Sequence, residues 1–241
     1  MTIMTTIADR LAQVVLRIQN AERAHGRTPG SVQLVAVSKT FGPEAVRAAY
    51  AAGQRAFGEN YVQEALSKMT ALASLPLQWH CIGPVQSNKS RWVAEHFDWV
   101  HTVASDKLAQ RLSAQRPPEK GPLQVCIQVN IDAGPNKSGV APHQALALAQ
   151  TVARLPGLRL RGMMCIPEPA PDFAAATAVF KRAKALFDEL NSTGLSMDTL
   201  SLGMSADLEA AIAAGSTLVR VGSAIFGARG GAATAAGASY S

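Results

Sequence analysis

A lysine that follows a short apolar run is the first residue of the chain suited to covalent chemistry. Lys39 ends the run Val-Ala-Val-Ser-Lys at 35–39, and in an extended strand it shares a face with Val35 and Val37. An ammonium group beside apolar neighbours loses solvation, which favours the neutral amine and lets it attack a carbonyl carbon. Most lysines instead lie in solvent, so Lys39 by itself could simply mark the exit of a strand.

Two segments near the carboxyl end of the chain have the composition of an anion site. The first is Gly-Met-Ser at 203–205, directly before a helix that we expect to open at Ala206. Ser205 can cap this helix, or its hydroxyl and nearby free backbone N–H groups can hold an anion. The second is Arg-Val-Gly-Ser at 220–223, where Gly222 lets backbone amides approach a ligand closely.

The elements that carry these residues alternate regularly along the chain. Short apolar runs predict strands at 32–37, 55–58, 78–82, 99–102, 123–130, 160–164, 199–202 and 217–221. Amphipathic segments predict helices at 43–52, 61–73, 89–96, 107–115, 143–155, 173–191 and 206–214, with a further helix before the first strand and a short turn around Ile225. Strands that alternate with helices pair in parallel.

Eight such units in 241 residues predict an α/β fold, a single (β/α)8 TIM-type barrel with an extra N-terminal helix. The barrel domain is expected over 1–229, followed by a flexible Gly/Ala-rich tail over 230–241. An open doubly wound sheet is the alternative. No G-x-G-x-x-G follows the first strand, which argues against a dinucleotide-binding version of that sheet.

Closure of a barrel would bring the reactive residues together. The last strand would lie beside the first, and the loops after strands seven and eight are the usual phosphate site of such barrels. Lys39 and an anion clamp would then share one mouth, with Arg220 between them. This combination predicts a phosphate ligand that carries an aldehyde, a description that pyridoxal 5′-phosphate fits.

Several segments together resemble a known family. They are VAVSKT at 35–40, FGENYVQEA at 57–65, WHCIGPVQSNKSRWV at 79–93, VNIDAGPNKSGV at 129–140, LRLRGMMCIPEP at 158–169 and LSLGMSADLEAAIAAGSTLVRVGSAIFGAR at 200–229. The chain resembles the pyridoxal phosphate homeostasis proteins (the YggS/PROSC group), whose barrel is similar to the N-terminal domain of alanine racemase. One departure is Cys81, where the family usually has phenylalanine, and we expect it to alter packing rather than function.

The resemblance implies a protein that buffers or delivers pyridoxal 5′-phosphate, possessing no catalytic residues and passing the cofactor to apo-enzymes. It implies these cofactor-binding residues: Lys39 for the Schiff base, Asn60 near the ring, Arg220 facing the pyridine nitrogen, and Met204, Ser205, Gly222 and Ser223 around the phosphate. A cation beside the ring nitrogen disfavours its protonation, which damps carbanion chemistry while the aldehyde stays reactive.

Three further residues keep two interpretations each. His80 could line the pocket or be a core histidine with satisfied hydrogen bonds. Lys89 and Lys137 follow strands three and five, so they could reach the mouth or lie in solvent.

An amino-acid racemase is the alternative function. Racemisation needs an acid or base on each face of the substrate carbon. In alanine racemase, a tyrosine from an additional β-domain lies opposite the lysine. Tyr50, Tyr61 and Tyr240 do not match such a position, and the chain ends shortly after the eighth strand. We therefore expect no more than feeble side reactions.

The composition of the chain bears on three other classes of protein: nucleic-acid-binding, metal-binding and membrane proteins. The net charge is +6 and the pI is about 9.5, yet lysine and arginine are scattered, so a nucleic-acid interface is not expected. Cys81, Cys126 and Cys165 lie in apolar stretches without metal-ligand spacing, which predicts buried free thiols, no metal site and a cytoplasmic protein. No stretch predicts a membrane span. A monomer or a weak dimer is expected.

Overall fold

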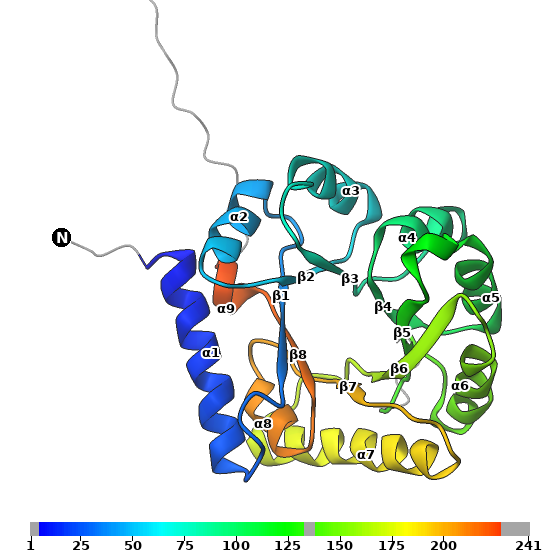
Figure 1. Ribbon diagram of the computed structural model, residues 1–241. Coiled ribbons are helices and arrows are strands. Elements are labelled where there is room, and N and C mark those ends of the chain that lie inside the picture. The colour runs from blue at the N-terminus through cyan, green and yellow to red at the C-terminus, as the bar shows by residue number, and fades with distance from the viewer. Residues whose placement is uncertain (1–4, 133–137, 228–241) are drawn as a thin grey trace, which may run out of the picture.

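Eight parallel strands close into a barrel in the computed structural model, which describes residues 5–132 and 138–227 (Figure 1). The strands are β1 Gln33–Val37, β2 Ala56–Glu59, β3 Gln78–Cys81, β4 Trp99–Val103, β5 Leu123–Gln128, β6 Leu158–Met164, β7 Thr199–Ser201 and β8 Leu218–Val221. Each strand pairs with the next, and β8 pairs with β1 with Arg220 opposite Val35. The predicted barrel is confirmed, and the open sheet is excluded.

The helices surround the strands. They are α1 Ile7–Ala24, α2 Pro43–Ala51, α3 Val62–Ala71, α4 Ser90–His96, α5 Asp106–Gln115, α6 Ala145–Ala153, α7 Phe173–Ser192, α8 Leu208–Ala213 and α9 Ser223–Phe226. Short 3-10 turns lie at Ser87–Lys89 (η1), Pro118–Lys120 (η2) and Pro142–Gln144 (η3). Within the described ranges, no helix is both long enough and apolar enough to cross a membrane.

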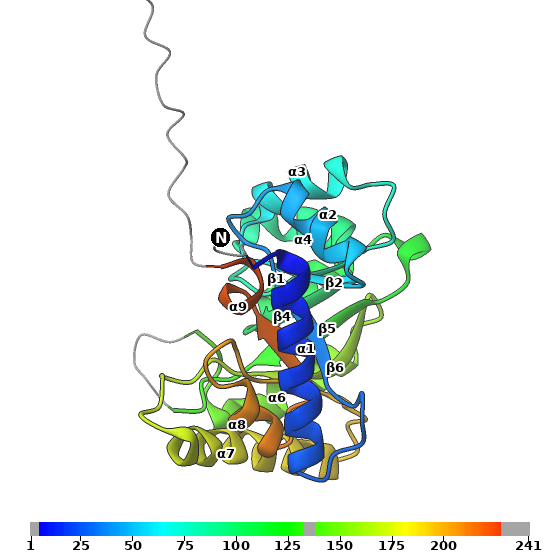
Figure 2. The ribbon, with the colours of Figure 1, turned by 90° about the vertical axis from the view of Figure 1, so that its left-hand side faces the viewer.

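Helix α1 is the extra N-terminal helix that the sequence predicts. It begins at a capping box, in which the Thr6 hydroxyl accepts from the Asp9 N–H and the Asp9 carboxylate accepts from the Thr6 N–H. Its apolar stripe, with Leu11, Val14 and Ile18 at helical spacing, is buried. In Figure 2 the helix runs along the outside of the barrel, where it packs against α8 and α9.

The hydrophobic core has two parts, one between the strands and the helices and one inside the barrel. One face of each strand packs on the helices in a large cluster that includes Ala36 and Phe57. The opposite face points into the barrel, where the apolar clusters are small; Val35 belongs to one and Trp99 to another. Because side chains alternate along a strand, residues next to Val35 in register, such as Arg220, also face inward. The barrel interior therefore has room for polar side chains.

Candidate functional site

A cavity of about 550 Å³ opens at the carboxyl ends of the strands. All seven residues that the sequence places at the cofactor line it: Lys39, Asn60, Met204, Ser205, Arg220, Gly222 and Ser223. The apolar part of the lining includes Val37, Phe41, Ile82 and Ile166. A concave apolar pocket with a few convergent polar groups is the usual form of a small-ligand site.

Lys39 lies two residues beyond β1 and is partly exposed. No hydrogen bond or ion pair joins its ammonium group to another residue of the described segments. The backbone on either side of it is held firmly. The Ser38 carbonyl accepts from Lys68 Nζ at 2.7 Å, and the Thr40 N–H donates to Glu64 Oε1 at 2.6 Å. Thr40 has a φ of 70°, which non-glycine residues rarely adopt.

A buried ion pair between Lys68 and Glu59 holds the backbone at Ser38 in place. Lys68 Nζ donates to Glu59 Oε1 at 2.7 Å and to Glu64 Oε1 at 2.6 Å, so its three N–H groups have three acceptors. The Ser38 hydroxyl donates to Glu59 Oε1 at 2.5 Å. Burial raises the pKa of Glu59, and the Lys68 ammonium opposes that rise. The sequence interpretation missed both partners of Lys68. The spacing of four between Glu64 and Lys68 is a readable helical signal, whereas Glu59 lies nine residues from Lys68 and has no such signal.

Asn60 directly follows β2 and lines the cavity. Its Oδ1 is buried and has no hydrogen-bond partner within the described segments. Gly83 makes this position of the Asn60 backbone possible, because a Cβ on Gly83 would lie 2.5 Å from the Asn60 carbonyl oxygen. Buried amide oxygens are usually hydrogen-bonded, so the side chain has a free acceptor at the edge of the cavity.

The loops after β7 and β8 meet at Ser205. The Ser205 hydroxyl accepts from the Ala224 N–H at 3.3 Å, which joins the two loops. Gly222 packs against β1, since a Cβ there would lie 3.2 Å from the Val37 carbonyl oxygen. The sequence interpretation of Ser205 as a helix cap is wrong. Helix α8 begins two residues later than expected and Asp207 is its N-cap residue.

Arg220 is buried and faces into the barrel from β8. Its Nη1 donates to the Ser201 carbonyl at 2.8 Å and to Ser201 Oγ at 2.6 Å, and its Nη2 donates to the Cys165 carbonyl at 3.2 Å. None of the carboxylates in the described segments forms an ion pair with it. Burial lowers the pKa of Arg220 to about 10, so the group stays a cation at neutral pH.

A chain of buried side chains continues from Arg220 through the barrel. Ser201 Oγ lies 2.9 Å from His101 Nδ1, His101 Nε2 lies 2.9 Å from His80 Nδ1, and His80 Nε2 lies 3.0 Å from Gln78 Oε1. Gln78 Oε1 can only accept, and with both histidines neutral this fixes the direction of the chain. His80 carries its proton on Nε2 and accepts at Nδ1, His101 does the same, and the Ser201 hydroxyl donates to His101 Nδ1.

Burial keeps both histidines of this chain neutral. It lowers the pKa of His80 to about 3 and lowers that of His101 well below its usual value. Because every bond of the chain points away from Arg220, the acceptor ends of the dipoles face the guanidinium and stabilise its charge. His80 is thus a core histidine with both nitrogens bonded, and it does not line the cavity.

Replacing Ser201 by alanine is expected to lower the free energy of unfolding by about 1–3 kcal/mol, because His101 Nδ1 and Arg220 Nη1 each lose a buried partner. Urea denaturation measures the change. Ser192→Ala is the control, since its hydroxyl lies on the exposed side of α7 and bonds only the Glu189 carbonyl. Equal stability of the two variants would contradict the chain as described.

The other residues singled out from the sequence lie elsewhere. Lys89 ends η1 and does not line the cavity, and Lys137 lies outside the described residues, as does the tail 230–241. The three cysteines are buried and free, as expected. Burial raises the pKa of each thiol to about 12, so none is a ready nucleophile.

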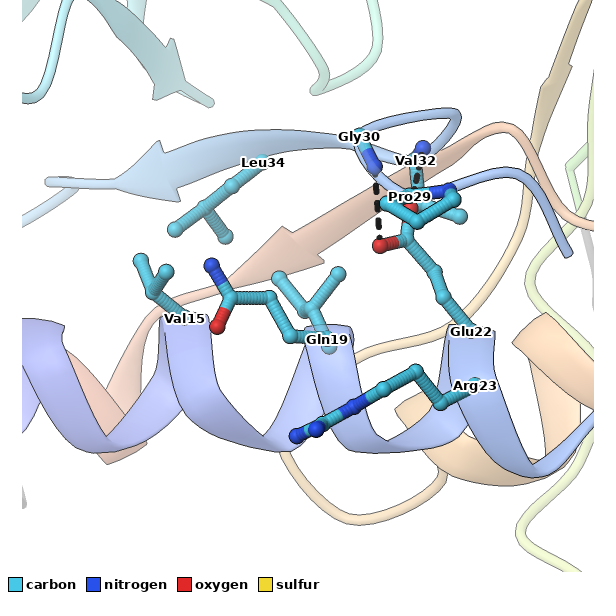
Figure 3. A pocket seen from close by; sticks show the side chains of 9 residues that line it. Val15, Gln19, Glu22, Arg23, Pro29, Gly30, Val32 and Leu34 are labelled. Atoms are coloured by element: carbon cyan, nitrogen blue, oxygen red, sulfur yellow. Dashed lines mark hydrogen bonds between the residues drawn. The ribbon is translucent and has the colours of Figure 1, made fainter.

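A second cavity, of about 370 Å³, lies between α1 and the loop that leads into β1 (Figure 3). The one carboxylate that lines it, Glu22, already accepts hydrogen bonds from the backbone. Glu22 accepts from the Gly30 N–H at 3.0 Å and from the Val32 N–H at 2.9 Å, which ties the loop to the helix. The remaining wall is largely apolar, with Val15 and Leu34 facing each other. The other polar side chains of its lining are Gln19 and Arg23, and neither an amide nor a guanidinium is a nucleophile.

Comparison with known proteins identifies the family. Residues 17–230 match the family described as alanine racemase, N-terminal domain. A pyridoxal phosphate homeostasis protein of Pseudomonas aeruginosa is 58% identical over 226 residues, which cover 94% of this chain and 97% of that protein. The chain belongs to the family of pyridoxal phosphate homeostasis proteins. Its relative in Escherichia coli K12 is 51% identical over 229 residues, or 94% of this chain and 98% of the relative.

Solved structures similar to this chain support the family assignment. PipY of Synechococcus elongatus, solved with pyridoxal phosphate bound, superposes with a TM-score of 0.80 at 40% identity and covers 92% of this chain and 100% of its own. Alanine racemase of Corynebacterium glutamicum is 16% identical with a TM-score of 0.68, covering 94% of this chain and 62% of its own. At that identity the likeness shows the fold alone. The chain shares this barrel with the racemase at low sequence identity.

Proposed function

We propose that this protein binds pyridoxal 5′-phosphate in the cavity at the strand ends, holds it as a Schiff base on Lys39, and thereby serves intracellular cofactor homeostasis. One observation carries the proposal: the same cavity is lined by an ammonium group without a partner among the described residues, by two loops joined at Ser205 and by a buried cation. The family supports it, because relatives are named for pyridoxal phosphate homeostasis and PipY was solved with the cofactor.

The lining residues fit the parts of such a cofactor. Lys39 has no competing partner among the described residues, so its amine is free to bond an aldehyde carbon. Ser205, Gly222 and Ser223 offer a hydroxyl and close-approaching backbone to the phosphate, with the Met204 main chain beside them. The cofactor supplies a reactive aldehyde and an electron-accepting ring when bound.

Arg220 and Asn60 would contact the pyridine ring of the cofactor. The guanidinium carries only donors, so a ring nitrogen beside it must accept and stays unprotonated. The buried chain behind Arg220 keeps that charge in place. Asn60 offers its free acceptor oxygen to the polar edge of the ligand. This arrangement weakens carbanion chemistry and leaves aldehyde chemistry intact, which suits storage and delivery better than turnover.

Racemase activity is the second candidate function, and the residues that line the cavity argue against it. No tyrosine is among the described residues that line the cavity. Tyr61 is exposed before α3, and Tyr50 lies under the Arg55 guanidinium on α2. We infer that the protein is a carrier that transfers the cofactor to apo-enzymes. We place it in the cytoplasm, because free thiols such as Cys81 stay reduced there.

The absorption spectrum of the purified protein, before and after borohydride, tests the proposed function. A Schiff-base band that borohydride abolishes, with a pyridoxyl group mapped to the peptide that contains Lys39, is the expected result. A colourless protein that also fails to bind added pyridoxal 5′-phosphate would refute the proposal. An assay for alanine racemisation by the reconstituted protein decides between carrier and enzyme, and we expect only trace activity.

Ser205→Ala and Gly222→Ala are expected to weaken binding of pyridoxal 5′-phosphate by about ten-fold each, with a smaller loss for pyridoxal, which lacks the phosphate. The first removes a hydroxyl that joins the loops, and the second adds a Cβ against Val37. Titration with both ligands gives the two affinities. Ser105→Ala, at the N-cap of α5, is the control. Equal losses for both ligands would count against a phosphate site here.

A further inference from the structure

Helix α1 lies on the outer side of the two loops that meet at Ser205. It packs against α8, which follows the loop after β7, and against α9, which follows the loop after β8 (Figure 2). Its buried stripe packs it on the barrel, and its capping box stabilises its first turn. A rigid element in this place can hold both loops from behind while their inner side faces the cavity.

Arg17 of α1 bonds the first of these loops. Its Nη2 donates to the Ser205 carbonyl at 3.0 Å. The same guanidinium is fixed by Glu209 of α8, with Nε to Oε1 at 2.6 Å and Nη2 to Oε2 at 2.8 Å. Such a two-point pair sets the orientation of the guanidinium plane. The Ser205 backbone is thus held from outside, while its hydroxyl joins the Ala224 N–H.

Arg10 of α1 bonds the second loop. Its Nε donates to the Ile225 carbonyl at 2.6 Å, and its Nη1 donates to the Thr5 carbonyl at 3.0 Å, at the start of the same helix. Ile225 belongs to α9, the single turn that begins at Ser223. Arg10 and Arg17 are seven residues apart, so they lie on the same face of α1, two turns from each other.

We propose that Arg10 and Arg17 are positioning residues that hold the loops after β7 and β8 in the conformation that binds phosphate. The proposal rests on the proposed function and adds to it a role for α1, which lines no part of the cavity itself. Both arginines act on backbone carbonyls, so losing either gives its loop conformational freedom that phosphate binding must then remove.

The test uses the full-length apo-protein with Arg17→Met and Arg10→Met, each titrated with pyridoxal 5′-phosphate and with pyridoxal. We expect each variant to bind the phosphorylated ligand about five- to ten-fold more weakly, with a change below about two-fold for pyridoxal. The ratio of the two affinities reports the phosphate side and does not depend on the fraction of folded protein. Arg17→Lys, which keeps a donor for Ser205, is expected to restore part of the ratio.

Two other arginines provide matched controls. Among the described residues, the Arg23 side chain on α1 bonds only Asn20 of the same helix. Arg27 follows α1 and donates to the Ile212 carbonyl near the far end of α8. Arg23→Met and Arg27→Met are expected to leave the ratio at its wild-type value. If they lower it as much as Arg17→Met, the effect is one of net charge and the proposal is overturned.

An unchanged ratio in Arg10→Met and Arg17→Met would also overturn it. That result leaves the proposed function standing as long as Ser205→Ala still discriminates between the two ligands. Failure of the wild-type protein to bind either ligand would instead refute the proposed function itself. The two failures are therefore distinguishable in one set of titrations.

Discussion

Lys39→Ala is expected to lose the Schiff-base absorption band entirely and to leave no pyridoxyl group on the protein after borohydride. No other lysine among the described residues lines the cavity, so no second amine is in place to form the bond. The phosphate side stays intact in this variant, and weak non-covalent binding should persist. Spectrophotometry followed by mass spectrometry of the reduced protein measures both effects.

Two further substitutions make this result specific. Lys39→Arg keeps the positive charge but cannot form a Schiff base, so it should lose the band as completely as the alanine variant. Lys181→Ala removes an exposed lysine of α7 and should keep the wild-type spectrum. A band that survives in Lys39→Ala would move the covalent site to another lysine.

Lys68→Met is expected to lower the free energy of unfolding by about 3–5 kcal/mol, because it leaves a buried carboxylate without its cation. Glu59 is fully buried and its Oε1 accepts from Lys68 Nζ at 2.7 Å. Lys184→Met is the control: Lys184 pairs with Asp188 on an exposed helix face, at the i,i+4 spacing that Lys68 has with Glu64. It should cost at most about 1 kcal/mol in urea denaturation. Similar losses for both variants would contradict the buried pair.

The destabilisation by Lys68→Met should depend on pH. Burial raises the pKa of Glu59 in the folded chain above its ordinary value of 4.5. Between these two pKa values the folded state binds more protons than the unfolded state, so stability falls as the pH rises through that window. The cost of the charged carboxylate is present in full above the folded pKa.

Burial raises the pKa of Glu59 and the Lys68 ammonium opposes that rise, so loss of this cation raises the pKa further. The window in which the folded state holds the extra proton then extends to higher pH. The stability difference between wild type and Lys68→Met should therefore shrink as the pH is lowered from about 8 to about 5. A difference that grows on acidification would mean that Glu59 is not the group left uncompensated.

The sequence alone predicted the barrel and the residues that line the cavity at its carboxyl end. Alternation of short apolar runs with amphipathic segments is a local signal, because side chains repeat every two residues in a strand and about every 3.6 in a helix. The active ends of a barrel are set by strand direction, so Lys39, Ser205 and Gly222 could be assigned to one mouth before any coordinates. Those residues line a single cavity in the structure.

Element boundaries were predicted less well where neighbours decide them. Helix α8 begins at Leu208, two residues after the expected start, because the Asp207 carboxylate takes the Met204 N–H and holds the loop open. Strand β5 ends at Gln128, before the expected end at Asn130, because the Asn130 N–H donates to the Val140 carbonyl rather than to a barrel strand. Both effects come from contacts that the local sequence pattern does not contain.

Only the tertiary structure decided what supports the reactive residues. The chain from Arg220 to His80 takes one side chain from each of β8, β7, β4 and β3, and Glu59 meets Lys68 across a strand and a helix. These groups are distant in sequence or out of phase with any local period, so composition and spacing give no sign of their pairing. They must find partners because burial removes water, and an unpaired buried polar group is costly. Closure of the barrel is what brings those partners within hydrogen-bonding distance.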